Sequence, residues 1–348
     1  MTQALDGSTL WHLPPFGAVR RRDLLTCVAL VAATLLCAAI HLRTGTIDLR
    51  WSGIWQAVLG QAGDDSYAIW QVRLPRLALG WCVGCSVALT GALMQSLVQN
   101  PLADPGLLGL SQGALVAVIL SMVFWPALPY PLLPLVALTG GLAVGLVLIA
   151  LTRGAAQAGM AVLLMGIAVE TLLSSVASVL ALYTPPEVSA ALGAWMAGSL
   201  VMADWPRVWT FLPWGLLCLP AIVFFGPATR LFDLGDAMAQ SLGEATRRSK
   251  PAVLVLAVLI ASASVTAVGP LSFLGVLGPH LAGFLNRASG RVRLIQSALM
   301  GGLLVVAGDT LSRSVSGDLA LPLGLALTLI GAPLFIITLR LRNLRRRL

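Results

Sequence analysis

Charged residues are scarce in this chain: they make up 10% of its 348 residues, against 58% hydrophobic residues. Soluble domains contain about a quarter charged residues, so this composition excludes a soluble globular protein. Lysine is almost absent, since Lys250 is the only one. The net charge of +8 therefore comes from arginines. Because these arginines flank hydrophobic runs, we attribute them to orientation in membrane lipid and expect no nucleic-acid partner.

Residue patterns for catalysis and metal binding are also lacking. His12, His41 and His280 do not have the spacing of a metal site, such as two histidines one helical turn apart. The pair Cys82–Cys85 has no second pair beside it, so we interpret it as helix packing. No phosphate-loop glycine pattern precedes Lys250. We therefore predict no catalytic residue, no metal site, no cofactor in this chain and no binding of ATP by that motif.

Long hydrophobic runs dominate the sequence. About 20 apolar residues cross a bilayer as one helix, and ten such runs lie between charged residues, glycines or prolines. Small residues four apart, such as Gly80, Gly84 and Ala88, predict close helix packing in lipid. We predict an all-α integral membrane protein with one transmembrane domain, 1–348, and a tail at 1–23. The predicted spans are 24–41, 77–97, 106–125, 131–151, 159–182, 207–225, 251–268, 270–286, 294–312 and 319–339.

Positive charges divide unevenly between the two sides of this predicted bundle. With the N-terminus inside, sixteen of the 22 Lys and Arg residues fall on the inner side and six on the outer side. Positive residues favour the cytoplasmic side, so we predict a multi-pass protein with both termini in the cytoplasm. The largest polar segment on the inner side is 229–250, which is long enough for one or two short helices along the membrane surface.

The outer arginines need an explanation of their own. Arg73 and Arg76 either anchor a helix end at the interface or form a docking patch for an acidic partner outside. Asp309 and Arg313 are four residues apart, which predicts a local ion pair near another outer helix end.

Glu170 lies in the middle of the span 159–182, with no arginine within one helical turn. Acidic residues inside a membrane are candidates for function. Three roles are open: proton or cation coupling, a pore-lining group in a water-filled cavity, or a neutral acid hydrogen-bonded to a neighbouring helix. The first would make the chain a proton-coupled secondary transporter.

Several motifs occur in order over roughly residues 70–340. They are Arg73-Leu-Pro-Arg76, Asn100-Pro-Leu-Ala103, Gly269-Pro-Leu-Ser-Phe273-Leu-Gly275, Asp309-x-x-x-Arg313 and Leu321-Pro-x-Gly324. Together they resemble the FecCD-type permeases of type II ABC importers, which carry iron siderophores, haem and cobalamin. The resemblance implies a ten-span permease that carries a metal chelate across the bacterial inner membrane. A ferric siderophore is the first expectation, with haem or cobalamin as alternatives.

The resemblance also implies partners and site residues. The partners are an ABC ATPase dimer that binds ATP and Mg, a periplasmic or lipoprotein substrate-binding protein, and a second permease subunit, identical or different. The family positions that dock the binding protein correspond to Arg73, Arg76 and Arg313 in this chain. A cytoplasmic gate is matched by Asn100 and Leu102, with Gly159 and Met160 as a second gate element. ATPase coupling within 229–250 is matched by Leu234, Gly235, Asp236, Leu242 and Gly243. Asp104 departs from the family pattern beside the gate.

Overall fold

A bundle of hydrophobic helices makes up most of the computed structural model, which describes residues 2–3, 9–13, 17–45, 49–60, 65–125, 127–129, 132–151, 158–184, 192–193, 195–315 and 321–345. Within these ranges, eight helical segments are long and apolar enough to cross a membrane, and α4 and α12 are shorter apolar helices. The predicted all-α fold is confirmed, and each of the ten predicted runs corresponds to one of these segments. They are α1 (Arg21–Arg43), α3 (Leu74–Val98), α4 (Leu110–Phe124), α5 (Leu133–Leu151), α6 (Ala158–Ala181), α8 with α9 (Trp205–Leu216 and Cys218–Phe232), α11 (Thr246–Val268), α12 (Leu274–Leu285), α13 (Gly290–Val315) and α14 (Leu323–Arg345).

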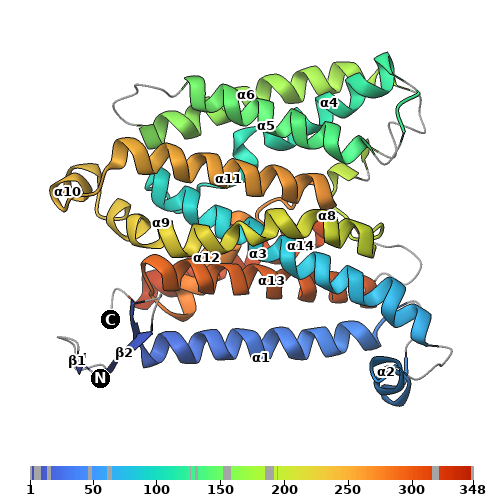
Figure 1. Ribbon diagram of the computed structural model, residues 1–348, viewed down its shortest axis with the longest axis horizontal. Coiled ribbons are helices and arrows are strands. Elements are labelled where there is room, and N and C mark those ends of the chain that lie inside the picture. The colour runs from blue at the N-terminus through green and yellow to red at the C-terminus, as the bar shows by residue number, and fades with distance from the viewer. Residues whose placement is uncertain are drawn as a thin grey trace.

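Short elements lie at the two ends of the bundle. Three strands before α1 form a small antiparallel sheet in the order β1-β2-β3. In Figure 1, β2 and α10 lie at one end of the long helices and α2 at the opposite end. The short helix expected within 229–250 is therefore present as α10. These elements are β1 (Thr2–Gln3), β2 (Thr9–Leu13), β3 (Gly17–Arg20), α2 (Trp51–Val58), the π-helix η1 (Ala68–Arg73), the 3-10 helix η2 (Pro105–Leu108) and α10 (Asp236–Ser241).

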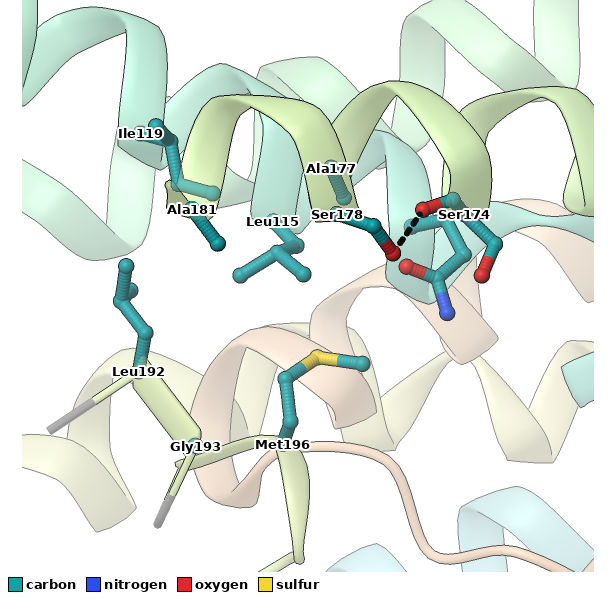
Figure 2. A pocket seen from close by; sticks show the side chains of 10 residues that line it. Leu115, Ile119, Ser174, Ala177, Ser178, Ala181, Leu192, Gly193 and Met196 are labelled. Atoms are coloured by element: carbon teal, nitrogen blue, oxygen red, sulfur yellow. Dashed lines mark hydrogen bonds between the residues drawn. The ribbon is translucent and has the colours of Figure 1, made fainter. Parts of the chain in front are cut away.

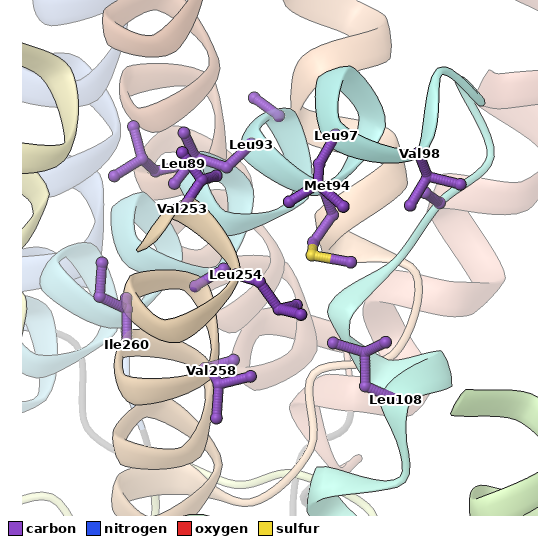
Figure 3. Packing of buried hydrophobic residues seen from close by; sticks show 14 of the residues in the cluster. Leu89, Leu93, Met94, Leu97, Val98, Leu108, Val253, Leu254, Val258 and Ile260 are labelled. Carbon is purple, nitrogen blue, oxygen red and sulfur yellow. The ribbon is translucent and has the colours of Figure 1, made fainter. Parts of the chain in front are cut away.

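Helix α3 is the centre of the bundle. In its most apolar stretch 78% of the residues are buried, against 11% for α1, which lies at the edge of the molecule in Figure 1. Figure 3 shows Leu89 and Leu93 of α3 in one buried cluster with Val253 and Leu254 of α11. Because α3 runs through the core from end to end, it positions functional residues at both of its ends.

Glycines set how closely α3 approaches its neighbours. A Cβ atom added to Gly84 would lie 2.6 Å from the carbonyl oxygen of Gly301 in α13, and one added to Gly301 would overlap Ala88. Gly91 meets the backbone of Gly275 in α12 in the same way. In lipid, helices associate through such close packing and not through a hydrophobic driving force. The prediction of close packing at Gly84 and Ala88 is confirmed.

Candidate functional site

The three predicted docking arginines come together at the N-terminal end of α3. We call Arg73, Arg76, Arg313, His41 and Asp309 the arginine cluster. Arg73 is 5% exposed, and its Nη1 donates to the carbonyl oxygens of Leu42 and Arg43 at 2.6 and 2.8 Å. These are among the last carbonyls of α1, where the helix dipole favours a positive charge. Arg73 is therefore directed inward as a cap on α1.

Asp309 pairs with a different arginine from the one predicted. Its carboxylate accepts two hydrogen bonds from Arg76, at 2.9 Å from Nε and 2.7 Å from Nη2. Arg313 instead donates from Nη2 to the carbonyl oxygen of Thr44 at 2.6 Å. The predicted local pair of Asp309 with Arg313 is wrong, because α13 turns Asp309 toward α3. A bidentate arginine–carboxylate pair is among the stronger polar contacts, so it joins these two helices.

His41 connects α1 to the same cluster. Thr310 donates its hydroxyl proton to the carbonyl oxygen of Val306 at 2.7 Å, so it accepts from His41 Nδ1 at 3.2 Å. Arginine can only donate, so His41 Nε2 accepts from Arg313 Nη1 at 3.4 Å. With one nitrogen donating and the other accepting, the imidazole is neutral. Three guanidinium groups against one carboxylate leave this end of the bundle positive.

At the opposite end of α3, the predicted gate residues form a tight turn. Gln99 closes the helix with a left-handed backbone, φ 57°. Asn100 follows, and its Oδ1 accepts from the backbone N–H of Leu102 at 2.9 Å. Asparagine side chains favour such turns because they replace a backbone acceptor. Leu102 is 53% exposed, so the turn presents an apolar side chain at the surface. We call residues 99–104 the gate turn.

Asp104 fastens the gate turn to α12. Its Oδ1 accepts from the backbone N–H of Gly106 at 2.7 Å, and a Cβ atom added to Gly275 would lie 3.1 Å from the same oxygen. Burial raises the pKa of Asp104 to about 6, and hydrogen bonds from the backbone N–H groups of Gly106 and Val276 act in the opposite direction. The carboxylate thus sits at the N-terminal end of α12, where a helix favours negative charge. The sequence signal for this role was an aspartate directly before Pro105.

The predicted coupling segment forms α10 and its two flanking turns. Gly235 and Gly243 bracket the helix with φ of 95° and 88°, which glycine adopts without steric cost. Leu234, Met238 and Leu242 are 57%, 52% and 57% exposed. Met238 and Leu242 are four residues apart and share one face of α10, and Leu234 directly precedes the N-cap Gly235, so exposed apolar side chains lie within the helix and on both sides of it. Met238 was not among the predicted coupling residues, although its position four residues before Leu242 indicates it.

A hollow of about 310 Å³ opens between α4, α6 and the segment around residues 192–196. Figure 2 shows Leu192 and Met196 facing the residues of α4 and α6 across it. Most of its lining is apolar or small. Its lining residues are Gln112, Leu115, Ile119, Ser174, Ala177, Ser178, Ala181, Leu192, Gly193 and Met196.

Helix α6 also carries three other predicted residues, Gly159, Met160 and Glu170. It begins at Ala158, and the surroundings of Gly159 and Met160 lie outside the described part of the structure. Glu170 is half-buried on α6, and its backbone packs closely against Gly109. A Cβ atom added to Gly109 would lie 3.0 Å from the backbone nitrogen of Glu170. The second gate element and the role of Glu170 stay predictions.

The geometry describes a helical bundle with membrane-length spans, a positive cluster at one end of α3, and a tight turn and the exposed short helix α10 toward the other end. Residues 31–341 match the family model of the FecCD transport family. The chain belongs to this family. As a FecCD-family member it is a transport permease subunit, a multi-pass inner-membrane protein, and is not itself an enzyme.

Individual relatives support the same assignment. The Fe(3+) dicitrate transport system permease protein FecD of Escherichia coli (strain K12) is 37% identical over 303 residues, which cover 86% of this chain and 93% of the relative. The hemin transport system permease protein HmuU of Yersinia pestis is 33% identical over 342 residues, covering 94% and 99%. A solved structure described as an inward-facing conformation of a metal-chelate type ABC transporter superposes with a TM-score of 0.78 at 25% identity, covering 91% and 99%. The resemblance found in the sequence is confirmed.

Proposed function

We propose that this chain is the membrane-spanning subunit of an ATP-driven importer that moves a metal chelate across the bacterial inner membrane. The observation that carries this proposal is the family match over residues 31–341. Relatives of this chain are named for ferric dicitrate and for hemin transport. A ferric chelate of the siderophore class is the cargo we propose first, and haem and cobalamin are the alternatives.

ATP hydrolysis takes place in a separate ABC ATPase dimer, which binds ATP and Mg. The proposed docking element is α10 with its flanking residues Leu234, Gly235, Asp236, Leu242 and Gly243. The exposed side chains of Leu234, Met238 and Leu242, in and beside this helix, support the assignment. The cores of protein interfaces are depleted of charge and rich in apolar side chains.

The cargo passes by alternating access, in which one cavity opens first to one side and then to the other. Asn100 and Leu102, with Gly159 and Met160, would close the cytoplasmic end. A second permease subunit, identical or different, would face α6. The exposure of α6 supports this contact, since large apolar side chains such as Leu164 and Leu172 are more than half exposed along it.

Orientation follows from the charge distribution. The sixteen-to-six division of Lys and Arg residues supports a cytoplasmic position for both termini and α10. The arginine cluster then faces outward, where a substrate-binding protein with acidic residues would dock on the positive charge of Arg73, Arg76 and Arg313. Arg73 is 5% exposed, so it would contribute its charge and not a direct contact. The positive charge of the cluster at the side where such charge is uncommon supports this role.

Reconstitution tests the proposal directly. The permease is placed in proteoliposomes with the ABC ATPase and binding protein of the same transport system, and uptake of labelled ferric citrate, a ferric hydroxamate and hemin is measured. We expect uptake of one class that requires ATP and stops when the ATPase is omitted. A proton-coupled transporter would instead take up solute without the ATPase, under a pH gradient, and lose that activity in Glu170→Gln. Such a result would overturn the proposal.

A further inference from the structure

Polar side chains from five parts of the chain meet between α10 and the C-terminal end of α3. Each makes a hydrogen bond or an ion pair across elements that are far apart in sequence. They lie between α10 and the gate turn, so a displacement of α10 toward the gate turn would act on them first. They are Gln99 after α3, Asp233 after α9, Asp236 in α10, Lys250 in α11 and Arg293 in α13, and we call them the linkage cluster.

Gln99 joins the gate turn to the C-terminal end of α9, close to the start of α10. Its side-chain Nε2 donates to the carbonyl oxygen of Phe232 at 2.8 Å and lies 3.5 Å from Asp236 Oδ1. Its backbone is left-handed, a conformation uncommon for residues other than glycine. Because Asn100 is the next residue, a displacement of Gln99 is a displacement of the gate turn.

Lys250 ties α10 to α11. Its Nζ donates to Asp236 Oδ1 at 2.5 Å, and the lysine side chain is 7% exposed. The same ammonium group lies 5.6 Å from the ring centre of Phe232. A partly buried ion pair is costly to break by removing one partner, since the other charge is then left without compensation. A displacement of α10 that keeps this ion pair intact therefore also displaces the start of α11.

Arg293 makes a second connection, to α3 itself. Its Nη1 donates to both carboxylate oxygens of Asp233, at 3.1 and 3.0 Å, and to Ser96 Oγ at 2.7 Å. Its Nη2 donates to Gln95 Oε1 at 3.1 Å. Gln95 is 6% exposed, and its Nε2 has no acceptor among the described residues. Leaving a buried amide donor without an acceptor is unfavourable. A second position of the C-terminal end of α3 in which Gln95 Nε2 finds an acceptor would therefore be favoured in free energy.

We propose that the linkage cluster transmits the movement of α10 to the gate turn, so that its members are positioning residues of the transport cycle. The proposal rests on the proposed function above. Two connections leave the junction between α9 and α10, one from Phe232 through Gln99 to the gate turn and one from Asp233 through Arg293 to α3. Together they tie this junction to the C-terminal end of α3, and the pair of Asp236 with Lys250 ties α10 to α11.

The test measures chelate uptake per ATP hydrolysed in the full complex in proteoliposomes. In Gln99→Asn the amide and the tolerance for a left-handed backbone are kept, but the side chain is one methylene shorter. We expect hydrolysis and co-purification with the ATPase to match the wild type, and uptake per ATP to fall about fivefold or more. A purely structural role would lower the amount of assembled complex and leave this ratio unchanged.

Lys250 supplies an independent pair of variants. We expect Lys250→Met to lower the ratio and Lys250→Arg to keep it, since arginine can still reach a carboxylate as a charged donor. The control is Asp204→Asn with Arg207→Gln, an exposed ion pair at the start of α8 whose asparagine still caps the helix. An unchanged ratio in both Gln99→Asn and Lys250→Met, with an active wild-type complex, would refute the linkage. A wild-type complex that takes up no chelate would instead refute the proposed function.

Discussion

Asp104 shows at the scale of one residue how burial changes a titrating group in the gate turn. The pKa of this carboxyl is raised to about 6 because its charged form is removed from water. The folded protein therefore holds the proton more tightly than the unfolded chain, whose aspartate has a pKa near 3.8. As the pH rises between these two values the unfolded chain loses its proton first. The free energy of unfolding falls across that window and is level above it.

Substituting Asp104→Asn removes this pH dependence and keeps an oxygen acceptor for Gly106. We expect the stability of the wild type relative to the variant to decrease by about 3 kcal/mol from pH about 4 to pH about 6, and to stay constant from pH 7 to 8. Unfolding in detergent, followed across that pH range for both proteins, measures the difference. Parallel curves for the two proteins would show that Asp104 titrates as an ordinary exposed carboxyl.

Helix pairs depend on glycine at the element scale, because α3 and α12 approach too closely at Gly91 for a side chain. A Cβ atom there would overlap the backbone of Gly275, which cannot move away as a flexible side chain could. The small-residue pattern along α3 is thus a packing requirement and not a flexible hinge.

Gly91→Ala should therefore destabilise the bundle by about 1–3 kcal/mol, since overpacking forces the two helices apart. Gly283→Ala is the matched control: it lies within α12, and no described atom is within 4 Å of the added Cβ. Alanine is the better helix former, so the control should be neutral or more stable by about 0.5–1 kcal/mol. Thermal unfolding in detergent compares them, and equal losses in both variants would contradict the packing argument.

For the molecule as a whole, the proposed docking role of the arginine cluster depends on the net charge that several helices bring to one end of the bundle. Arg73 and Arg76 also hold α1 and α13, so reversing their charge would disturb the fold as well as docking. Arg313 offers a cleaner change, since its backbone partner Thr44 carries no charge. The contribution of Arg313 to the binding free energy of the substrate-binding protein is reduced by solvent screening, as for most partly exposed charges.

Arg313→Gln should weaken binding of the substrate-binding protein about two- to fivefold and lessen its salt dependence. The control, Arg76→Gln with Asp309→Asn, leaves the net charge of the cluster unchanged and should affect docking less. Binding to the permease complex in nanodiscs at two salt concentrations gives both quantities. If the control weakens docking more than Arg313→Gln does, net charge is not what the binding protein recognises.

Hydrophobic runs and charge asymmetry were sufficient to predict ten membrane segments and the presence of a short helix within 229–250. Each of these features depends on residues close together in the chain, and hydropathy adds up locally whatever the neighbouring helices do. The ordered motifs from Arg73 to Gly324 were likewise enough to indicate the family. All of this was determined by the sequence alone.

The tertiary structure decided which polar groups meet. Spacing along α13 favoured a pair of Asp309 with Arg313, yet the rotation of that helix against α3 brings Asp309 to Arg76. Likewise no local pattern brings Gln99 to Phe232 or Arg293 to Asp233, which lie 133 and 60 residues away. Such contacts depend on which face each helix buries and how closely glycines let the helices approach, and these are properties of the packed bundle.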